Sequence, residues 1–239
     1  MLSHLSLVQL NIERDKHLEQ VTNFLAANTF DVACLQELLE SNISSLELAM
    51  NAKCLFAPMG YHKTDHSRQR WGVGIFSRPA VKKEIVESYA QRNVSTASFD
   101  PTEPEIKYTL VCCDIEKEGV LFRIATTHFP WTSYGQADAF QRESVQTLMR
   151  SLKSHGDLVI CGDFNAPRGG EIFSIVTKQF TDNIPSEYVT SIDGALHRAG
   201  PLELMVDGIF STSSYRVSNV ERKCGLSDHC AFTALIERV

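Results

Sequence analysis

The sequence predicts an α+β protein in which short strands outnumber helices. Its 239 residues are 43% hydrophobic and 22% charged, which is ordinary for a globular protein with a sizeable core. Short apolar runs bounded by Gly, Pro, Asn and Asp recur along the whole chain and have the length of strands. Only a few segments carry apolar residues at helical spacing. No linker or repeat interrupts this pattern, so we expect one domain over residues 1–239.

The first part of the chain is expected to alternate strands with helices. Leu18, Val21 and Leu25 show the spacing of one helical face. The predicted order is a strand over 5–10, a helix over 14–28, a strand over 30–35 that ends in Gln36 and Glu37, a helix over 41–53, and short strands over 54–57 and 72–77.

The middle of the chain predicts strands that fold back on one another. Glu118-Gly119 stands between two apolar runs and is a hairpin signal. Val145, Leu148 and Leu152 mark the clearest helix, because they share one helical face. The predicted order is strands over 81–89, 106–115 and 120–127, with His128 after the last of them, and then a helix over 135–154.

The last part of the chain begins with a buried strand over 158–161. Gly162 is the expected point at which the backbone turns out of the sheet. A short helix with Ile172 and Val176 is expected next, and residues 183–201 show little pattern. Strands are predicted over 202–210, over 215–220 at a sheet edge, and from 226–229 through 236.

Polar side chains able to bind a cation or a phosphate stand where many of these strands end. Asp163 and Asn165 lie two residues apart, so in extended geometry they project to the same side. Taken alone, they are equally well explained by an Asx turn that caps the next element. The full ordered set is N-x-E at Asn11, L-Q-E at Glu37, T-H at His128, G-D-F-N at Asp163 and Asn165, D-G-I-F at Asp207, and S-D-H at Asp228 and His229.

This order of motifs resembles the endonuclease/exonuclease/phosphatase superfamily, and the likeness runs from about residue 5 to residue 236. The resemblance implies a four-layer αββα sandwich, in which two mixed β-sheets face each other and helices cover the outside. It also implies a metal-dependent hydrolase that cleaves phosphate esters by in-line attack of an activated water. The strand ends would then converge at one rim of the sandwich.

A metal site is expected among these groups. Glu37 supplies the hard carboxylate that Mg²⁺ prefers, so it is the first-choice ligand, with Mn²⁺ as the alternative cation. Asn11 and Asp228 are further candidates, and Asp163 and Asn165 could also ligate directly or through water. Glu13 is expected to be a surface carboxylate or to act only behind the ligands.

The resemblance further implies a catalytic role for the remaining motifs. Asp163 would orient or deprotonate the attacking water, and the Asn165 amide would contact the phosphate, as Asn11 can do. Asp207 would orient His229, which either stabilises the transition state as a cation or transfers a proton. A histidine such as His128 would donate to the phosphate or to the leaving group.

The substrate is less defined than the chemistry. We expect a phosphodiesterase acting on nucleic acid or a nucleotide adduct, contacted by Arg68, Arg70 and Trp71 in the basic segment 61–71. His197 and Arg198 are further candidates for substrate contact. Alternatively, segment 61–71 is a solvated loop. The net charge of −6 keeps open a phosphomonoesterase of a small phosphorylated metabolite, and a non-catalytic binding module on the same fold is the third alternative.

The seven cysteines contain no C-x-x-C pair and mostly lie within apolar runs. We expect free core thiols in a reducing compartment, and neither a disulfide frame nor a zinc site. No signal peptide and no apolar run of membrane-spanning length is apparent, so the sequence predicts a cytoplasmic protein without a membrane or an obligate protein partner.

Overall fold

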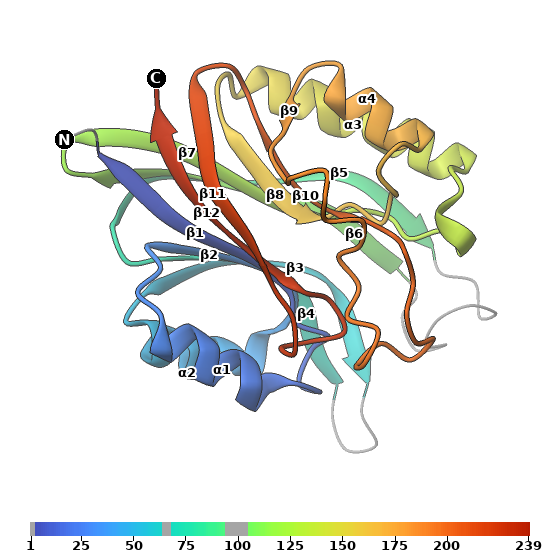
Figure 1. The fold of residues 1–239 in the computed structure, drawn as a ribbon, viewed down its shortest axis with the longest axis horizontal. Coiled ribbons are helices and arrows are strands. Elements are labelled where there is room, and N and C mark those ends of the chain that lie inside the picture. Colours follow the sequence, from blue (N-terminus) through green and yellow to red (C-terminus); the bar gives the residue numbers. More distant parts are fainter. Residues whose placement is uncertain (1–2, 64–67, 94–104) are drawn as a thin grey trace.

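Two six-stranded sheets lie face to face in the part of the chain that the computed structural model describes, residues 3–63, 68–93 and 105–239. Helices cover the outer faces, so the molecule has four layers (Figure 1). The architecture confirms the predicted α+β class and the αββα sandwich. The first sheet is covered by α1 (Leu18–Ala27) and α2 (Ile43–Met50), and the second by α3 (Ala139–Ser154) and α4 (Glu171–Thr177).

The first sheet has the strand order β11-β12-β1-β2-β4-β3. At its centre β1 and β2 run parallel, with Asn11 opposite Gln36, and α1 connects them. The other pairings are antiparallel, and β11 is an edge strand as predicted. The strands are β1 (His4–Asn11), β2 (Val32–Leu39), β3 (Lys53–Lys63), β4 (Arg68–Ser77), β11 (Tyr215–Lys223) and β12 (Ala231–Arg238).

The second sheet has the order β5-β6-β7-β8-β10-β9 and repeats this plan. Its central strands β7 and β8 are parallel, with His128 opposite Asp163, and α3 connects them. Short 3₁₀ turns at Glu40–Asn42 and Ser133–Gly135 complete the described elements. The strands are β5 (Ala80–Asn93), β6 (Glu105–Lys117), β7 (Val120–His128), β8 (Val159–Asp163), β9 (Thr181–Asp182) and β10 (Asp207–Ser211).

Strand β1 shows why these residues form a strand buried on both faces. Leu5 and Leu7 belong to the core between the two sheets, whereas Val8 and Leu10 belong to the core under α1 and α2. Side chains two apart on a strand share a face, so Gln9 and Asn11 continue the side that looks toward the second sheet. The apolar core between the sheets therefore gives way to polar side chains at the end of β1.

The structure corrects the expectation that Gly162 turns the chain out of the sheet. Gly162 lies inside β8, paired with Thr127 of β7 and with Gly208 of β10. A Cβ atom at this position would lie 2.1 Å from the Thr127 carbonyl oxygen, and the backbone has φ +151°. The glycine thus permits close approach of β7, and the strand continues to Asp163.

Two further expectations differ from the structure. The segment 61–71 is a long hairpin, because β3 runs to Lys63 and β4 begins at Arg68; residues 64–67 between them lie outside the described part. Residues 202–206 are not a strand. The carbonyls of Leu202 and Leu204 instead accept hydrogen bonds from segment 190–191, for example Leu204 O from Ser191 N at 3.0 Å, and the strand begins only at Asp207.

No helix in the described ranges combines the length and the apolar character needed to cross a membrane.

Candidate active site

The polar residues singled out in the sequence converge at one end of the interface between the sheets. We call them the site group: Asn11, Glu37, His128, Asp163, Asn165, Asp207, Asp228 and His229. The two parallel strand pairs contribute the ends of β1, β2, β7 and β8, and Asp207 at the start of β10 pairs with Asp163. The carboxyl ends of parallel strands meet at the same edge of a sheet. Each sheet therefore brings the site-group residues of its parallel pair to one edge, and these two edges face each other.

His229 lies between two aspartates. Its Nδ1 is 2.7 Å from Asp207 Oδ2, and its Nε2 is 3.8 Å from Asp163 Oδ2. Burial on its own lowers the pKa of His229, but the negative charges of Asp207 and Asp163 outweigh it and raise the pKa to about 10. His229 is therefore a cation at neutral pH, aimed at the centre of the site group.

Asp163 contacts several other members of the site group. It accepts from the Asn11 amide at 3.1 Å and from the Asn165 backbone N–H at 2.8 Å, and it lies 3.5 Å from His128 Nε2. Burial and the Asp207 charge raise the pKa of Asp163, while the two histidines oppose them. A carboxylate with this environment can accept a proton more readily than an exposed aspartate.

Asn165 lies beside both Asp163 and His128. Its side-chain Nδ2 donates to the Phe129 carbonyl at 3.0 Å and lies 3.0 Å from His128 Nε2. The backbone at Asn165 is left-handed, with φ 47°. This conformation lets Asn165 fold back beside Asp163, which is the Asx-type turn considered for this motif. The turn and the functional site are thus the same structure.

Glu37 offers a carboxylate at the other side of the site group. A bulge between Leu35 and Leu38 interrupts the pairing of β2 with β4, and Glu37 takes a left-handed conformation there (φ 52°). Asn11 Nδ2 donates to Glu37 at 3.3 Å, and Arg14 Nε lies 3.5 Å from it. Burial raises the pKa of Glu37, but the charges of His128 and Arg14 and the Asn11 amide together lower it below its ordinary value.

Three carboxylates, those of Glu13, Glu37 and Asp228, lie near enough to one another to interact electrostatically. Burial raises the pKa of Asp228, and the nearby charges of Glu13 and Glu37 raise it further. Glu13 itself is only 8% exposed, more buried than a surface residue, and it pairs with Lys16 and with His17 at 3.3 Å. Mutual repulsion among buried carboxylates is relieved by a divalent ion, so this part of the site group fits Mg²⁺.

Asp163, Asp207 and His229 also place ligand atoms within 4.8 Å of one another. Asp207 nevertheless has both oxygens committed, Oδ1 to Gln9 Nε2 at 2.8 Å and Oδ2 to His229. A metal bound through Asp207 would share or displace at least one of these bonds. A metal site at Glu37 and Asp228, as expected from the sequence, stays a prediction.

Four of the eight non-glycine residues with positive φ in the described part of the chain lie in or beside the site group. Glu13, Arg14, Glu37 and Asn165 all have positive φ values between 47° and 65°, which side chains other than glycine rarely adopt. Such conformations cost free energy and persist where the surroundings enforce them, often at functional sites.

Sequence reasoning missed the polar layer beneath the site group. Gln9 donates to Gln36 at 2.9 Å and to Asp207, and Gln36 donates to Thr126 of β7 at 3.0 Å. All of these side chains are buried, and they link the two sheets directly. The signal was present, because Gln9 precedes Asn11 by two residues on the same face of β1. Arg14, which contacts Glu37, was also missed.

The predicted substrate-binding residues have different surroundings. The Trp71 ring lies 5.9 Å from the His128 ring, so it borders the site group. Arg68 stacks over the Tyr61 ring at 3.9 Å, and Arg70 Nε pairs with Glu40 at 2.7 Å, in a surface hollow along the β3–β4 hairpin. In the described part of the chain, no contact brings His197 or Arg198 to the site group; both follow Asp193 on a turn. Their roles stay predictions.

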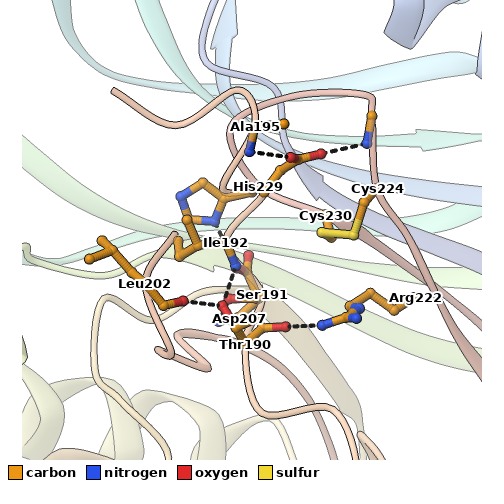
Figure 2. The surroundings of a disulfide bond; sticks show 12 residues. Thr190, Ser191, Ile192, Ala195, Leu202, Asp207, Arg222, Cys224, His229 and Cys230 are labelled. Atoms are coloured by element: carbon orange, nitrogen blue, oxygen red, sulfur yellow. Dashed lines mark hydrogen bonds and ion pairs between the residues drawn. A yellow bond between two sulfur atoms is a disulfide. The ribbon is translucent and has the colours of Figure 1, made fainter. Parts of the chain in front are cut away.

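The expectation that all seven cysteines are free is wrong. Cys224 and Cys230 form a disulfide beside His229 (Figure 2). Their sulfurs and the Asp193 carboxylate cluster closely, but two bonded sulfurs are not thiolate ligands. The other five, Cys34, Cys54, Cys112, Cys113 and Cys161, are free, and all but half-buried Cys54 are core residues as expected.

Comparison with known proteins points to one family. The sequence model of the Endonuclease/Exonuclease/phosphatase family matches residues 8–229, most of the chain. No curated protein matches the sequence. An endonuclease/exonuclease/phosphatase from Bacteroides vulgatus is similar in structure, with a TM-score of 0.74 and 18% identity over 99% of this chain and 100% of that one.

Two other similar structures are a phosphatase and a catalytic domain with a bound sulfate anion. A mannosyl-6-phosphatase from Bacteroides thetaiotaomicron has a TM-score of 0.69 and 15% identity, covering 97% of this chain and 99% of that one. The human Nocturnin catalytic domain with bound sulfate has a TM-score of 0.70 and 14% identity, covering 99% of this chain and 94% of that one. At these identities the likeness shows the shared fold.

Proposed function

Because the chain belongs to the Endonuclease/Exonuclease/phosphatase family, whose members are metal-dependent hydrolases of phosphate esters, we propose that it hydrolyses a phosphodiester with Mg²⁺ and an activated water. The observation that carries this proposal is the placement of His229 between Asp207 at 2.7 Å and Asp163 at 3.8 Å. A buried cation beside a buried carboxylate suits the two needs of the reaction, stabilisation of negative charge and removal of a proton.

The pKa of His229 supports a division of labour between these groups. A histidine with a pKa of about 10 is already protonated at neutral pH and cannot accept the proton of water. We therefore assign that proton to Asp163, whose pKa is raised by burial and by Asp207. His229 then donates a hydrogen bond to a phosphoryl oxygen as negative charge develops there.

Amide groups complete the phosphate site. Asn11 and Asn165 can donate to phosphoryl oxygens without adding negative charge, if each exchanges one of its present hydrogen bonds, such as Asn11 to Glu37 or Asn165 to Phe129 O, for one to the phosphate. To His128, which lies beside Asn165, we assign the donation to the leaving oxygen, so that water supplies the new P–O bond and the alcohol departs with a proton. Glu37 and Asp228 would hold the metal, which when bound neutralises charge on the phosphoryl group.

The substrate proposed first is a nucleic acid or a nucleotide adduct. Trp71 borders the site group and could stack on a base, with Arg68 and Arg70 farther along the same strand. The second candidate is a small phosphorylated metabolite. The ion pair of Arg70 with Glu40 and the net charge of −6 favour it, because both weaken attraction to a polyanion.

The proposal is tested with purified protein, Mg²⁺ and bis-p-nitrophenyl phosphate. We expect Glu37→Gln and His229→Gln to lower kcat/KM by at least about a hundredfold, the scale of losing a group that stabilises developing charge. Glu84→Gln, at an exposed position of the edge strand β5, is the matched control, and its kcat/KM should equal that of the wild type. Equal activity in all four proteins would contradict the assignment.

A substrate panel separates the two candidates. DNA, RNA, 5′-phosphotyrosyl DNA and inositol phosphates are compared under one metal condition. Turnover confined to small phosphomonoesters would reject the nucleic-acid proposal and support the second candidate.

A further inference from the structure

The Cys224–Cys230 disulfide closes the loop that carries Asp228 and His229 (Figure 2). We propose that this disulfide is a thiol–disulfide exchange site, and that its redox state controls how firmly the loop is held at the site group. The effect on the loop stands on the geometry alone, whereas the effect on turnover rests on the function proposed above.

The carboxyl-terminal arm of the loop is anchored without the disulfide. Cys230 N donates to Ser191 O at 2.7 Å, and Asp228 O accepts from Asp193 N at 2.9 Å. The His229 ring is held by Asp207. Cys230 is 1% exposed and leads directly into β12. This arm therefore keeps its place when the sulfurs separate.

The amino-terminal arm depends on the disulfide. It leaves β11, an edge strand, and residues 223–225 are exposed. Besides the disulfide, the Gly225 N–H donates to Asp193 Oδ2 at 2.6 Å, and the other Asp193 oxygen accepts from Ala195 N at 3.0 Å. After reduction, the exposed part of this arm, residues 224 and 225, keeps the Gly225 hydrogen bond, which is a weak restraint in water, whereas Leu226 still packs against the core under α1 and α2 and Ser227 stays buried.

The two sulfurs differ in access, and this sets the order of the exchange. Cys224 is exposed and Cys230 is buried. A thiolate of a dithiol reductant attacks the Cys224 sulfur and forms a mixed disulfide, while the Cys224–Cys230 bond breaks and the Cys230 thiolate leaves and takes up a proton. The second thiol of the reductant then displaces Cys224. The products are two protein thiols and the oxidised reductant, so two electrons pass to the protein.

Release of the amino-terminal arm acts on Asp228. Ser227 of that arm donates from its Oγ to Asp228 Oδ1 at 3.2 Å, so movement of the arm shifts this carboxylate although the Asp228 backbone carbonyl stays bonded to Asp193 N. A displacement of about 1 Å at a catalytic group costs up to about a hundredfold in rate. Since the other arm stays anchored, we expect a smaller effect, a roughly tenfold lower kcat/KM in the reduced protein.

The full chain is prepared oxidised and after treatment with dithiothreitol. Alkylation and peptide mass spectrometry should show Cys224 and Cys230 protected before reduction and modified after it. Hydrogen exchange of the amides in 224–227 should become faster on reduction, while that of Cys230 stays slow. Neither readout requires catalysis, so a protein without hydrolase activity would refute the proposed function and still decide the redox proposal.

The activity measurement uses two variants. Cys224→Ser removes an exposed sulfur and should show the reduced protein's activity with or without dithiothreitol. Cys54→Ser, at a half-buried free thiol in β3, is the matched control and should keep the roughly tenfold response. The proposal is overturned if Cys224 and Cys230 are alkylated without reductant, or if exchange and activity are the same in the oxidised and reduced wild type.

Discussion

Replacing Gly162 by alanine would push a methyl group into the backbone of β7. The added Cβ would lie 2.1 Å from the Thr127 oxygen, whereas ordinary contact begins at 3.4 Å, so the strands must separate by about 1.3 Å (3.4 − 2.1). Overpacking of this kind costs about 1–3 kcal/mol, and a side chain at φ +151° adds about 1 kcal/mol. We expect the free energy of unfolding to fall by about 2–4 kcal/mol.

The same displacement reaches the site group, because the next residues along the pair are His128 and Asp163, which lie opposite each other. A shift of about 1 Å between them should lower kcat/KM by about a hundredfold. Urea denaturation followed by tryptophan fluorescence measures stability, and bis-p-nitrophenyl phosphate hydrolysis measures activity.

Gly119→Ala is the matched control for backbone strain. Gly119 has φ +76°, but no atom lies within 4 Å of its would-be Cβ. It should lose only about 1 kcal/mol and keep full activity. If the Gly162 and Gly119 variants were equally stable and equally active, the close approach of β7 and β8 would not matter and the reasoning would fail.

Two further predictions concern charge. Asp207→Asn should let the pKa of His229 fall from about 10 toward 6.5. At about pH 8 the fraction of His229 in the cationic form would then drop to as little as ~3%, so kcat/KM should fall up to ~30-fold and recover as the pH is lowered. A loss of activity that does not depend on pH would speak against this role of Asp207. Lys117→Met removes the cation 2.7 Å from Asp31, a pair that bridges the two sheets. Burial raises the pKa of Asp31, but Lys117 and Ser6 lower it overall, so its stabilisation is present above about pH 3.8 and is lost as the pH falls through the lowered folded value. The variant should lose about 1–3 kcal/mol at neutral pH and show a flatter acid dependence in urea denaturation, and an unchanged curve would contradict the pair's contribution.

The layered fold and the composition of the site group were predictable because both depend on local patterns. Apolar runs identified the central strands, and the polar residues that end them are held together by parallel pairing, as for Asn11 beside Gln36 and His128 beside Asp163. The first and last residues of the strands were less predictable. β10 begins at Asp207 because residues 202–204 bond to segment 190–191 and do not pair with a strand. No pattern within residues 202–210 reveals that contact. That the whole chain is one domain stays a prediction.

The disulfide and the buried glutamines show the limit of sequence reasoning. Cys224 and Cys230 are six residues apart, and that spacing does not reveal that the loop folds back on itself beside Asp193. Gln9 and Gln36 look like ordinary polar residues until the second sheet supplies Asp207 and Thr126 as partners. Interactions between sheets require knowing which faces meet, and no local pattern carries that information.

The two parallel strand pairs, β1 with β2 and β7 with β8, give the enzyme two separable halves. One pair presents Asn11 and Glu37, and the other presents His128 and Asp163. Under the proposed assignment, the metal ligand Glu37 and the proton acceptor Asp163 lie on different sheets, which are joined by packing and by the glutamine layer. A small slip of one sheet against the other would therefore break the contacts between these residues, such as the hydrogen bond from Asn11 to Asp163.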